Sequence, residues 1–165
     1  PSSVDFSVTH QLTDALTLYV GSTYTRWSQL KKITVNNAGV SDITAELAGL
    51  GSITEEQHWH DTWSHAIGLS YQLNKQLVLR TGFSVDQTPT NNTDRSVRIP
   101  TGDRTVFSLG AGWTPVDNLT FDVAYSYLKE EPIKVRDNNP QLALTYDAKY
   151  ENSANGFGGS VTYRF

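Results

Sequence analysis

The side chains best suited to bind a ligand are arginines and acids in the middle of the chain. Arg80 and Asp86 fall on the polar side of one predicted strand, and Arg104 falls on the polar side of the next. Arg95 and Arg98 lie in the segment between these strands. Because a guanidinium group can bind a carboxylate through two parallel hydrogen bonds, these residues could hold an anionic head group. The alternative is that Arg80, Asp86 and Arg104 pair across neighbouring strands and only brace the sheet.

Metal binding and catalysis find little support in the sequence. His58 and His60 would point the same way on a strand, as two metal ligands must, but no third ligand follows at a recognisable spacing. Ser64 and His65 fall on opposite faces of a strand, so they cannot act together as nucleophile and base. No Gly-x-Ser-x-Gly motif and no phosphate-binding loop occurs. We therefore expect no metal, no cofactor and no enzymatic activity.

These candidate residues are positioned by β-strands, because apolar and polar residues alternate along most of the chain. In the last strand Phe157, Val161, Tyr163 and Phe165 share one face, whereas the other face carries Gly158, Ser160, Thr162 and Arg164. Alternation marks seven strands, around residues 4–8, 16–25, 63–71, 77–84, 105–113, 119–127 and 157–165. The one helix candidate covers residues 42–50, inside a loop. The pattern predicts an all-β, antiparallel fold and a single domain over residues 1–165.

The connections between the strands are alternately short and long. The short ones cover residues 12–15, 74–75 and 115–118, and the long ones cover 31–57, 86–103 and 129–154. Short turns on one rim and long loops on the other are typical of transmembrane β-barrels of the bacterial outer membrane. We therefore expect the long connections to face the outside and Phe165 to end at the periplasmic rim.

The two faces differ in a way that favours a membrane over water. One face carries Leu, Val, Phe, Tyr and Trp, with aromatic residues near both strand ends. The other face is mostly Gly, Ser, Ala and Thr, whereas a soluble lipid-binding β-barrel, the main alternative, would expose many charged residues there. We therefore expect the apolar face to contact outer-membrane lipid, or detergent in its place. The net charge of -4 and the lack of a basic stripe argue against a nucleic-acid partner.

A hydrophobic ligand would need apolar side chains on the inner face, and these are few. The inward candidates are Tyr19, Trp27, Val78, Val106 and Leu128. In the long connections Val97, Ile99 and Ile133 could form a groove at the outer rim, or they could simply pack the loops.

Several segments resemble the FadL-type long-chain fatty-acid transporter family. They are Tyr24-Thr25 followed by Trp27-Ser28-Gln29, Arg80-Thr-Gly-Phe-Ser-Val-Asp86 followed by Asp103-Arg104, Val123-Ala-Tyr-Ser-Tyr127 with Ile133-Lys134 beyond it, and the final Tyr163-Arg164-Phe165. The similarity runs in order over nearly the whole chain. It implies the C-terminal half of a fourteen-stranded barrel, without the N-terminal plug and first strands. A missing N-terminal half or an oligomer partner would then close the barrel.

The resemblance implies passive transport of fatty acids or other hydrophobic compounds across the outer membrane. A structural or adhesive outer-membrane barrel is the alternative. The residues expected to bind the ligand are Arg80, Arg104, Lys134, Asp86, Tyr19, Trp27, Val106 and Leu128. Tyr163 and Phe165 resemble the C-terminal signal that guides barrel assembly.

Overall fold

Seven of the strands form one antiparallel sheet, in the order β1-β2-β5-β6-β7-β8-β11. The computed structural model describes residues 1–37, 51–92, 95, 97, 99–139 and 144–165. The strands of the sheet are β1 (Ser3–Gln11), β2 (Leu16–Thr25), β5 (Thr62–Gln72), β6 (Leu77–Asp86), β7 (Arg104–Val116), β8 (Leu119–Glu130) and β11 (Ser153–Tyr163). These are the seven strands predicted from alternation, and each pairs with its neighbours along the chain.

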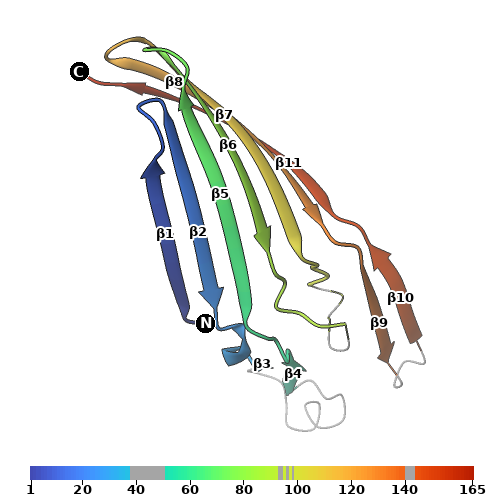
Figure 1. Cartoon of the computed structure of the whole chain (residues 1–165). Helices are drawn as coiled ribbons and strands as arrows, with labels where there is room; N and C mark the ends of the chain where they lie inside the picture. The colour runs from blue at the N-terminus through green and yellow to red at the C-terminus, as the bar shows by residue number, and fades with distance from the viewer. Residues whose placement is uncertain (38–50, 93–94, 96, 98, 140–143) are drawn as a thin grey trace.

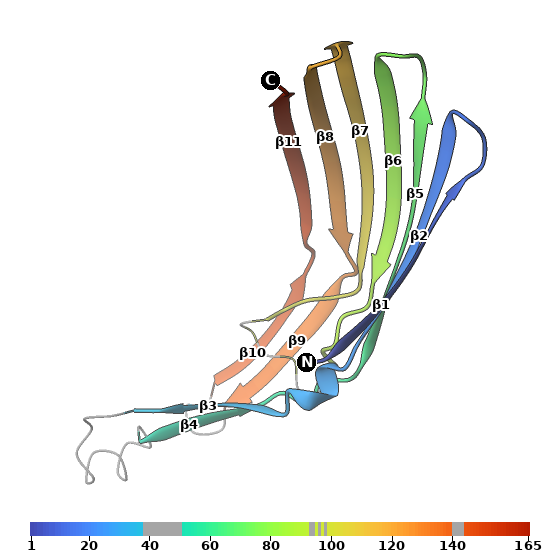
Figure 2. The same cartoon turned by 90° about the vertical axis from the view of Figure 1, so that its left-hand side faces the viewer.

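The sheet is curved and open, with β1 and β11 at its two edges (Figures 1 and 2). The short turns lie at the end where the C-terminus lies, and the long connections lie at the opposite end. In a bilayer, unpaired backbone groups at an open edge cost several kcal/mol each. Both edges would therefore have to pair with further strands for this sheet to stand in a membrane.

The hydrogen-bonded register keeps the two faces distinct across the whole sheet. Phe83, Phe107 and Tyr127 are direct neighbours on the convex face, and Gly82, Ser108 and Ser126 are direct neighbours on the concave face. The register confirms the assignment of every alternating segment to its face. A slip by one residue would reverse both faces at once, so the pattern specifies the pairing strongly.

The apolar face of the sheet is not buried within the chain. Phe157 is 82% exposed and Val123 61% exposed, and among the described residues the buried hydrophobic side chains are Ile133 and Val135, outside the sheet. A soluble barrel would instead close its apolar face over a core. The described residues include no helix that is both long and apolar enough to cross a membrane.

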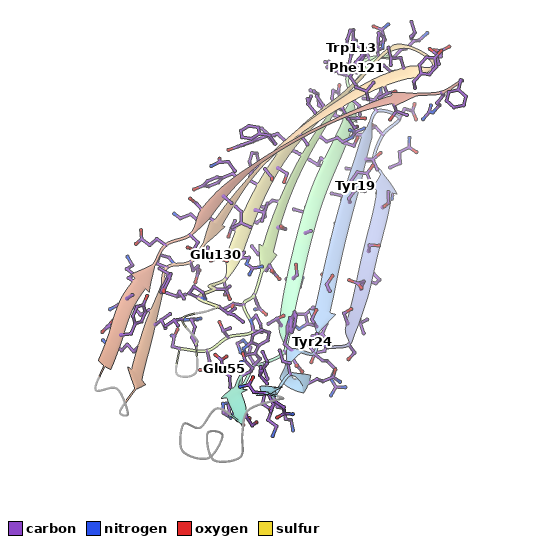
Figure 3. All side chains as sticks on the ribbon, turned by 180° about the vertical axis from the view of Figure 1, so that it is seen from behind. Tyr19, Tyr24, Glu55, Trp113, Phe121 and Glu130 are labelled. Atoms are coloured by element: carbon purple, nitrogen blue, oxygen red, sulfur yellow. The ribbon has the colours of Figure 1, made fainter. Side chains whose placement is uncertain are left out.

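The outward aromatic residues gather near both ends of the strands. Trp113 and Phe121 stack at the short-turn end, with ring centroids 5.6 Å apart. Near the long connections the ring centroids of Tyr24 and Trp63 are 5.1 Å apart (Figure 3). Aromatic rings in two such bands are typical of the two membrane–water interfaces of a barrel. The arrangement agrees with the bands expected from the sequence.

The long connections contain structure that the alternation analysis left out. They hold a short 3-10 helix, η1 (Trp27–Gln29), and two hairpins, β3 (Lys32–Asn36) with β4 (Ser52–Glu56), and β9 (Ile133–Asn139) with β10 (Leu144–Tyr150). These strands are short, so each offers too few alternating residues to stand out from a loop. The helix predicted at 42–50 lies outside the described residues. One predicted turn is also wrong at its start, because β7 continues to Val116 through an irregular register that accommodates Pro115.

The assignment of the faces predicts how two neighbouring residues of β7 respond to a thiol reagent. The chain has no cysteine, so a single introduced one can be labelled selectively. Ser108→Cys, on the concave face, should react with a small water-soluble methanethiosulfonate in lipid vesicles. Leu109→Cys should stay unlabelled, because lipid covers it. The opposite pattern would show that the faces are reversed.

Candidate functional site

A cavity of about 430 Å³ opens on the concave face at the long-connection end. Three parts of the chain line it: Thr23 and Thr25 of β2 with Trp27 of η1; Trp59, Thr62 and Ser64 around the start of β5; and, from the end of β6 to the start of β7, Asp86, Gln87, Thr88, Pro89, Thr90, Ile99, Thr101 and Arg104. Its size is within the range of small-molecule sites. We call it the rim cavity.

Two tryptophans form the aromatic part of the rim cavity. Trp27 lies in η1, and its ring meets that of Trp59 edge to face, with centroids 5.3 Å apart and planes at 71°. Trp27 was predicted to point inward from a strand; it lies just beyond β2, but it does line the cavity. Sequence reasoning missed Trp59, because it belongs to a segment without strand periodicity.

Asp61 fixes the segment that carries Trp27. Its carboxylate accepts a hydrogen bond from the Tyr24 hydroxyl at 2.7 Å and another from the Ser28 backbone N–H at 2.9 Å. Hydrogen bonds from Ser28, and then from Tyr24, hold the pKa of Asp61 at about 2. The ionised form therefore fastens η1 to the start of β5.

The hydrogen bonds of Asp61 predict a pH dependence at the acid end. Because the pKa of Asp61 is lower in the folded chain than its usual 3.8, its contribution to stability is fully present above that value. The contribution should disappear as the pH falls through about 2. Thermal midpoints of the native protein and Asp61→Asn should thus differ at neutral pH and converge in strong acid. A difference that stayed constant throughout would rule out this role for the carboxylate.

A row of three charged residues closes one side of the rim cavity. Asp86, Arg104 and Glu130 are direct neighbours across β6, β7 and β8. Arg104 Nε donates to Glu130 Oε1 at 2.9 Å, and Arg104 Nη1 lies 3.7 Å from Asp86 Oδ2. Glu130 is only 8% exposed, and its other oxygen accepts a hydrogen bond from Asn152 Nδ2 at 2.7 Å. Sequence reasoning missed Glu130, although it shares the polar parity of β8.

Arg80 lies far from this row and has a different partner. Its Nη1 donates to Asp122 Oδ1 at 2.8 Å, across β7. The two side chains meet over Gly112, where a Cβ would lie 2.7 Å from Asp122 Oδ1. Arg80 and Asp86 are six residues apart on one strand, or about 20 Å. The structure therefore separates Arg80 from the group in which the sequence analysis placed it.

The other predicted ligand-binding residues occupy three places. Val106 and Leu128 are direct neighbours on the concave face, two residues below Arg104 and Glu130. Tyr19 covers Gly68 on the same face, farther from the long connections than Tyr24 (Figure 3). Lys134 is exposed on β9, opposite Lys149, and is not part of the rim cavity. Their binding roles stay predictions.

The remaining sequence candidates are also placed by the structure. Ile133 packs against Gly102, which favours loop packing for this residue, whereas Ile99 lines the rim cavity. His58 and His60 lie outside any strand, so the strand geometry assumed for a metal pair does not apply. The ring centroids of Tyr163 and Phe165 are 6.4 Å apart at the short-turn end, and the assembly role of these residues stays a prediction.

A curved antiparallel wall, apolar on its convex face and polar on its concave face, defines a segment of an outer-membrane β-barrel. All of residues 1–165 match the family described as outer membrane protein transport protein (OMPP1/FadL/TodX), and the chain belongs to this family. Members of the family are transporters of the outer membrane and not enzymes, as predicted.

Curated relatives and solved structures agree with this family. The chain is 33% identical to outer membrane protein P1 of Haemophilus influenzae, covering 100% of this chain and 35% of that protein. It is 25% identical to the long-chain fatty acid transport protein of Escherichia coli K12, covering 86% of this chain and 28% of that protein. The chain thus spans about a third of the length of such relatives.

Among solved structures, a FadL homologue of Pseudomonas aeruginosa superposes with a TM-score of 0.81 at 30% identity, over 98% of this chain and 35% of that one. The toluene transporter TodX of Pseudomonas putida gives 0.63 at 16% identity, over 99% of this chain and 34% of that one. The second likeness shows the fold alone.

Proposed function

We propose that this chain forms part of the wall of an outer-membrane conduit for hydrophobic compounds, and that the rim cavity captures these compounds from outside. The observation that carries the proposal is the position of the Trp27–Trp59 pair. It lies on the concave side of a wall whose convex side is apolar, at the end of the long connections. Aromatic rings on the concave face do not contact lipid, so their surfaces can contact a ligand.

The concave face below the rim cavity supports passage of a ligand along the wall. Val106 and Leu128 form an apolar pair next to Arg104, on the side away from the long connections. The next row consists of Gly68, Gly82, Ser108, Ser126 and Gly156, with Tyr19 beside Gly68. Side chains this small leave the lumen wide and offer few groups that would hold a ligand strongly.

The names of the relatives fit this proposal without fixing the ligand. One is called a long-chain fatty acid transport protein and another a toluene transporter. Fatty acids and toluene share a hydrophobic body and differ in charge. For this chain we propose hydrophobic small molecules as the transported class, with fatty acids among the candidates.

The binding part of the proposal can be tested with Trp27→Ala. The protein, with any further strands that accompany this chain, would be placed in lipid nanodiscs and titrated with radiolabelled dodecanol and dodecanoate. Loss of one of the two tryptophan rings should weaken binding about tenfold, or about 1.4 kcal/mol. Trp113→Ala, on the convex face at the other end, is the matched control and should bind normally. Equal binding by both variants and the native protein would overturn the capture role.

A further inference from the structure

We infer that the rim cavity selects uncharged hydrophobic molecules over carboxylates. The inference rests on the proposed capture role, and it names the class of ligand that the cavity accepts. It follows from the pairing of charges and of hydroxyl groups around the cavity.

In the part of the rim cavity that the structure describes, the cation of the lining is already paired with carboxylates. Among its described lining residues the charged ones are Asp86 and Arg104, and both belong to the row that includes Glu130. That row holds one guanidinium between two carboxylates. The net charge of this row is negative, which disfavours a carboxylate relative to an uncharged ligand.

Glu130 is also held too firmly to move aside for a competing carboxylate. One of its oxygens accepts from Arg104 and the other from Asn152, and its backbone N–H donates to the Asn152 carbonyl at 3.0 Å. A ligand carboxylate that took its place on Arg104 would leave a buried carboxylate without a cationic partner, which is costly.

The polar lining of the β6–β7 segment is engaged in its own hydrogen bonds. The Thr88 hydroxyl lies 2.9 Å from the hydroxyls of both Thr90 and Thr101, and Thr90 Oγ1 also donates to the Thr101 carbonyl at 3.2 Å. Arg95 is 7% exposed and donates from Nε to Thr90 Oγ1 at 3.1 Å. The apolar surfaces of the lining are the tryptophan rings, Pro89 and Ile99, which fit rings and methylene chains.

A second hollow, similar in volume to the rim cavity, shares Trp59 with it and carries both signs of charge. It is lined by Ser28, Lys31, Glu56, His58 and Trp59. Lys31 is the residue there that could receive a carboxylate, which makes it the alternative that an experiment must test.

Two ligands with the same tail and different head groups test the inference. Dodecanol and dodecanoate would be titrated near neutral pH into the protein in lipid nanodiscs. The native protein should bind dodecanol about tenfold more tightly. In the double variant Asp86→Asn, Glu130→Gln, Arg104 becomes the only charge of its row. Binding of dodecanoate should then strengthen about tenfold, while binding of dodecanol should change by less than about twofold.

Controls separate the possible outcomes. Asp122→Asn removes the carboxylate partner of Arg80, far from the rim cavity, and should leave both affinities unchanged. Glu130→Gln alone keeps the shape of the side chain and replaces the double variant if that variant does not fold. Tighter binding of dodecanoate by the native protein would overturn the inference, and loss of that binding in Lys31→Gln would place its head group in the neighbouring hollow. Either result would leave the capture role intact. If Trp27→Ala left the affinities for both ligands unchanged, the capture role would be overturned instead.

Discussion

Arg104→Ala should lower the free energy of unfolding by about 3 kcal/mol, because it leaves Glu130 buried without a cationic partner. Glu130 is 8% exposed, and its carboxylate would keep, among the described residues, the hydrogen bond from Asn152. Breaking a buried pair by removing one partner costs more than the pair contributes, since the other charge cannot return to water. Urea-induced unfolding in lipid vesicles, followed by tryptophan fluorescence, measures the loss.

Arg80→Ala is the matched control for this prediction. It also removes an arginine from an ion pair on the concave face, but the side chains of Arg80 and Asp122 are 50% and 33% exposed. Water can solvate the carboxylate that remains, so the loss should be about 1 kcal/mol or less. Equal losses in the two variants would show that the burial of Glu130 does not matter.

Gly102→Ala should detach the β6–β7 segment from β9 and destabilise the protein by about 2 kcal/mol. A Cβ at this position would lie 2.3 Å from the Glu131 carbonyl oxygen and 3.0 Å from Ile133 Cγ2. The nearer of these atoms belongs to the backbone, and Glu131 N–H is bonded to the Asp103 carbonyl at 2.8 Å. The two segments therefore cannot make room without breaking their own contact.

Limited proteolysis and urea unfolding would both report this change. We expect faster cleavage within the β6–β7 segment and weaker ligand binding, since Ile99 and Thr101 line the rim cavity. Gly158→Ala is the control, because a Cβ there would meet no atom within 4 Å. If Gly102→Ala were as stable and as resistant to protease as Gly158→Ala, the close packing of the two segments would be wrong.

The fold of the sheet was predictable because a strand places every second residue on one face. Phe83 and Phe107 could be assigned to the lipid side from their own strands, before their pairing was known, and the register then joined them. The short strands of the hairpins offered no comparable signal. Ile133 and Val135 alternate with Lys134, but two apolar residues do not distinguish a strand from a loop.

The candidate site was predicted only in part, because it depends on segments from distant parts of the sequence. Asp86 and Arg104 were grouped correctly, since they close one hairpin connection. Arg80 was grouped with them wrongly, although six residues along a strand already separate two side chains by about 20 Å. The register of β8 brings Glu130 to Arg104, and Trp59 lines the rim cavity from a segment that is not a strand. Neither position could be inferred from local sequence.

The measurement that tests the account most directly is the uptake of radiolabelled dodecanol by bacterial cells with and without the protein. Cells that carry the native protein should take up dodecanol faster than cells that lack it. Cells that carry the double variant Trp27→Ala, Trp59→Ala at the same surface level should fall to the rate of cells without the protein, and Trp113→Ala should retain the native rate. Native uptake by the double variant, or equal uptake by cells with and without the protein, would contradict a conduit that captures hydrophobic compounds at the rim cavity.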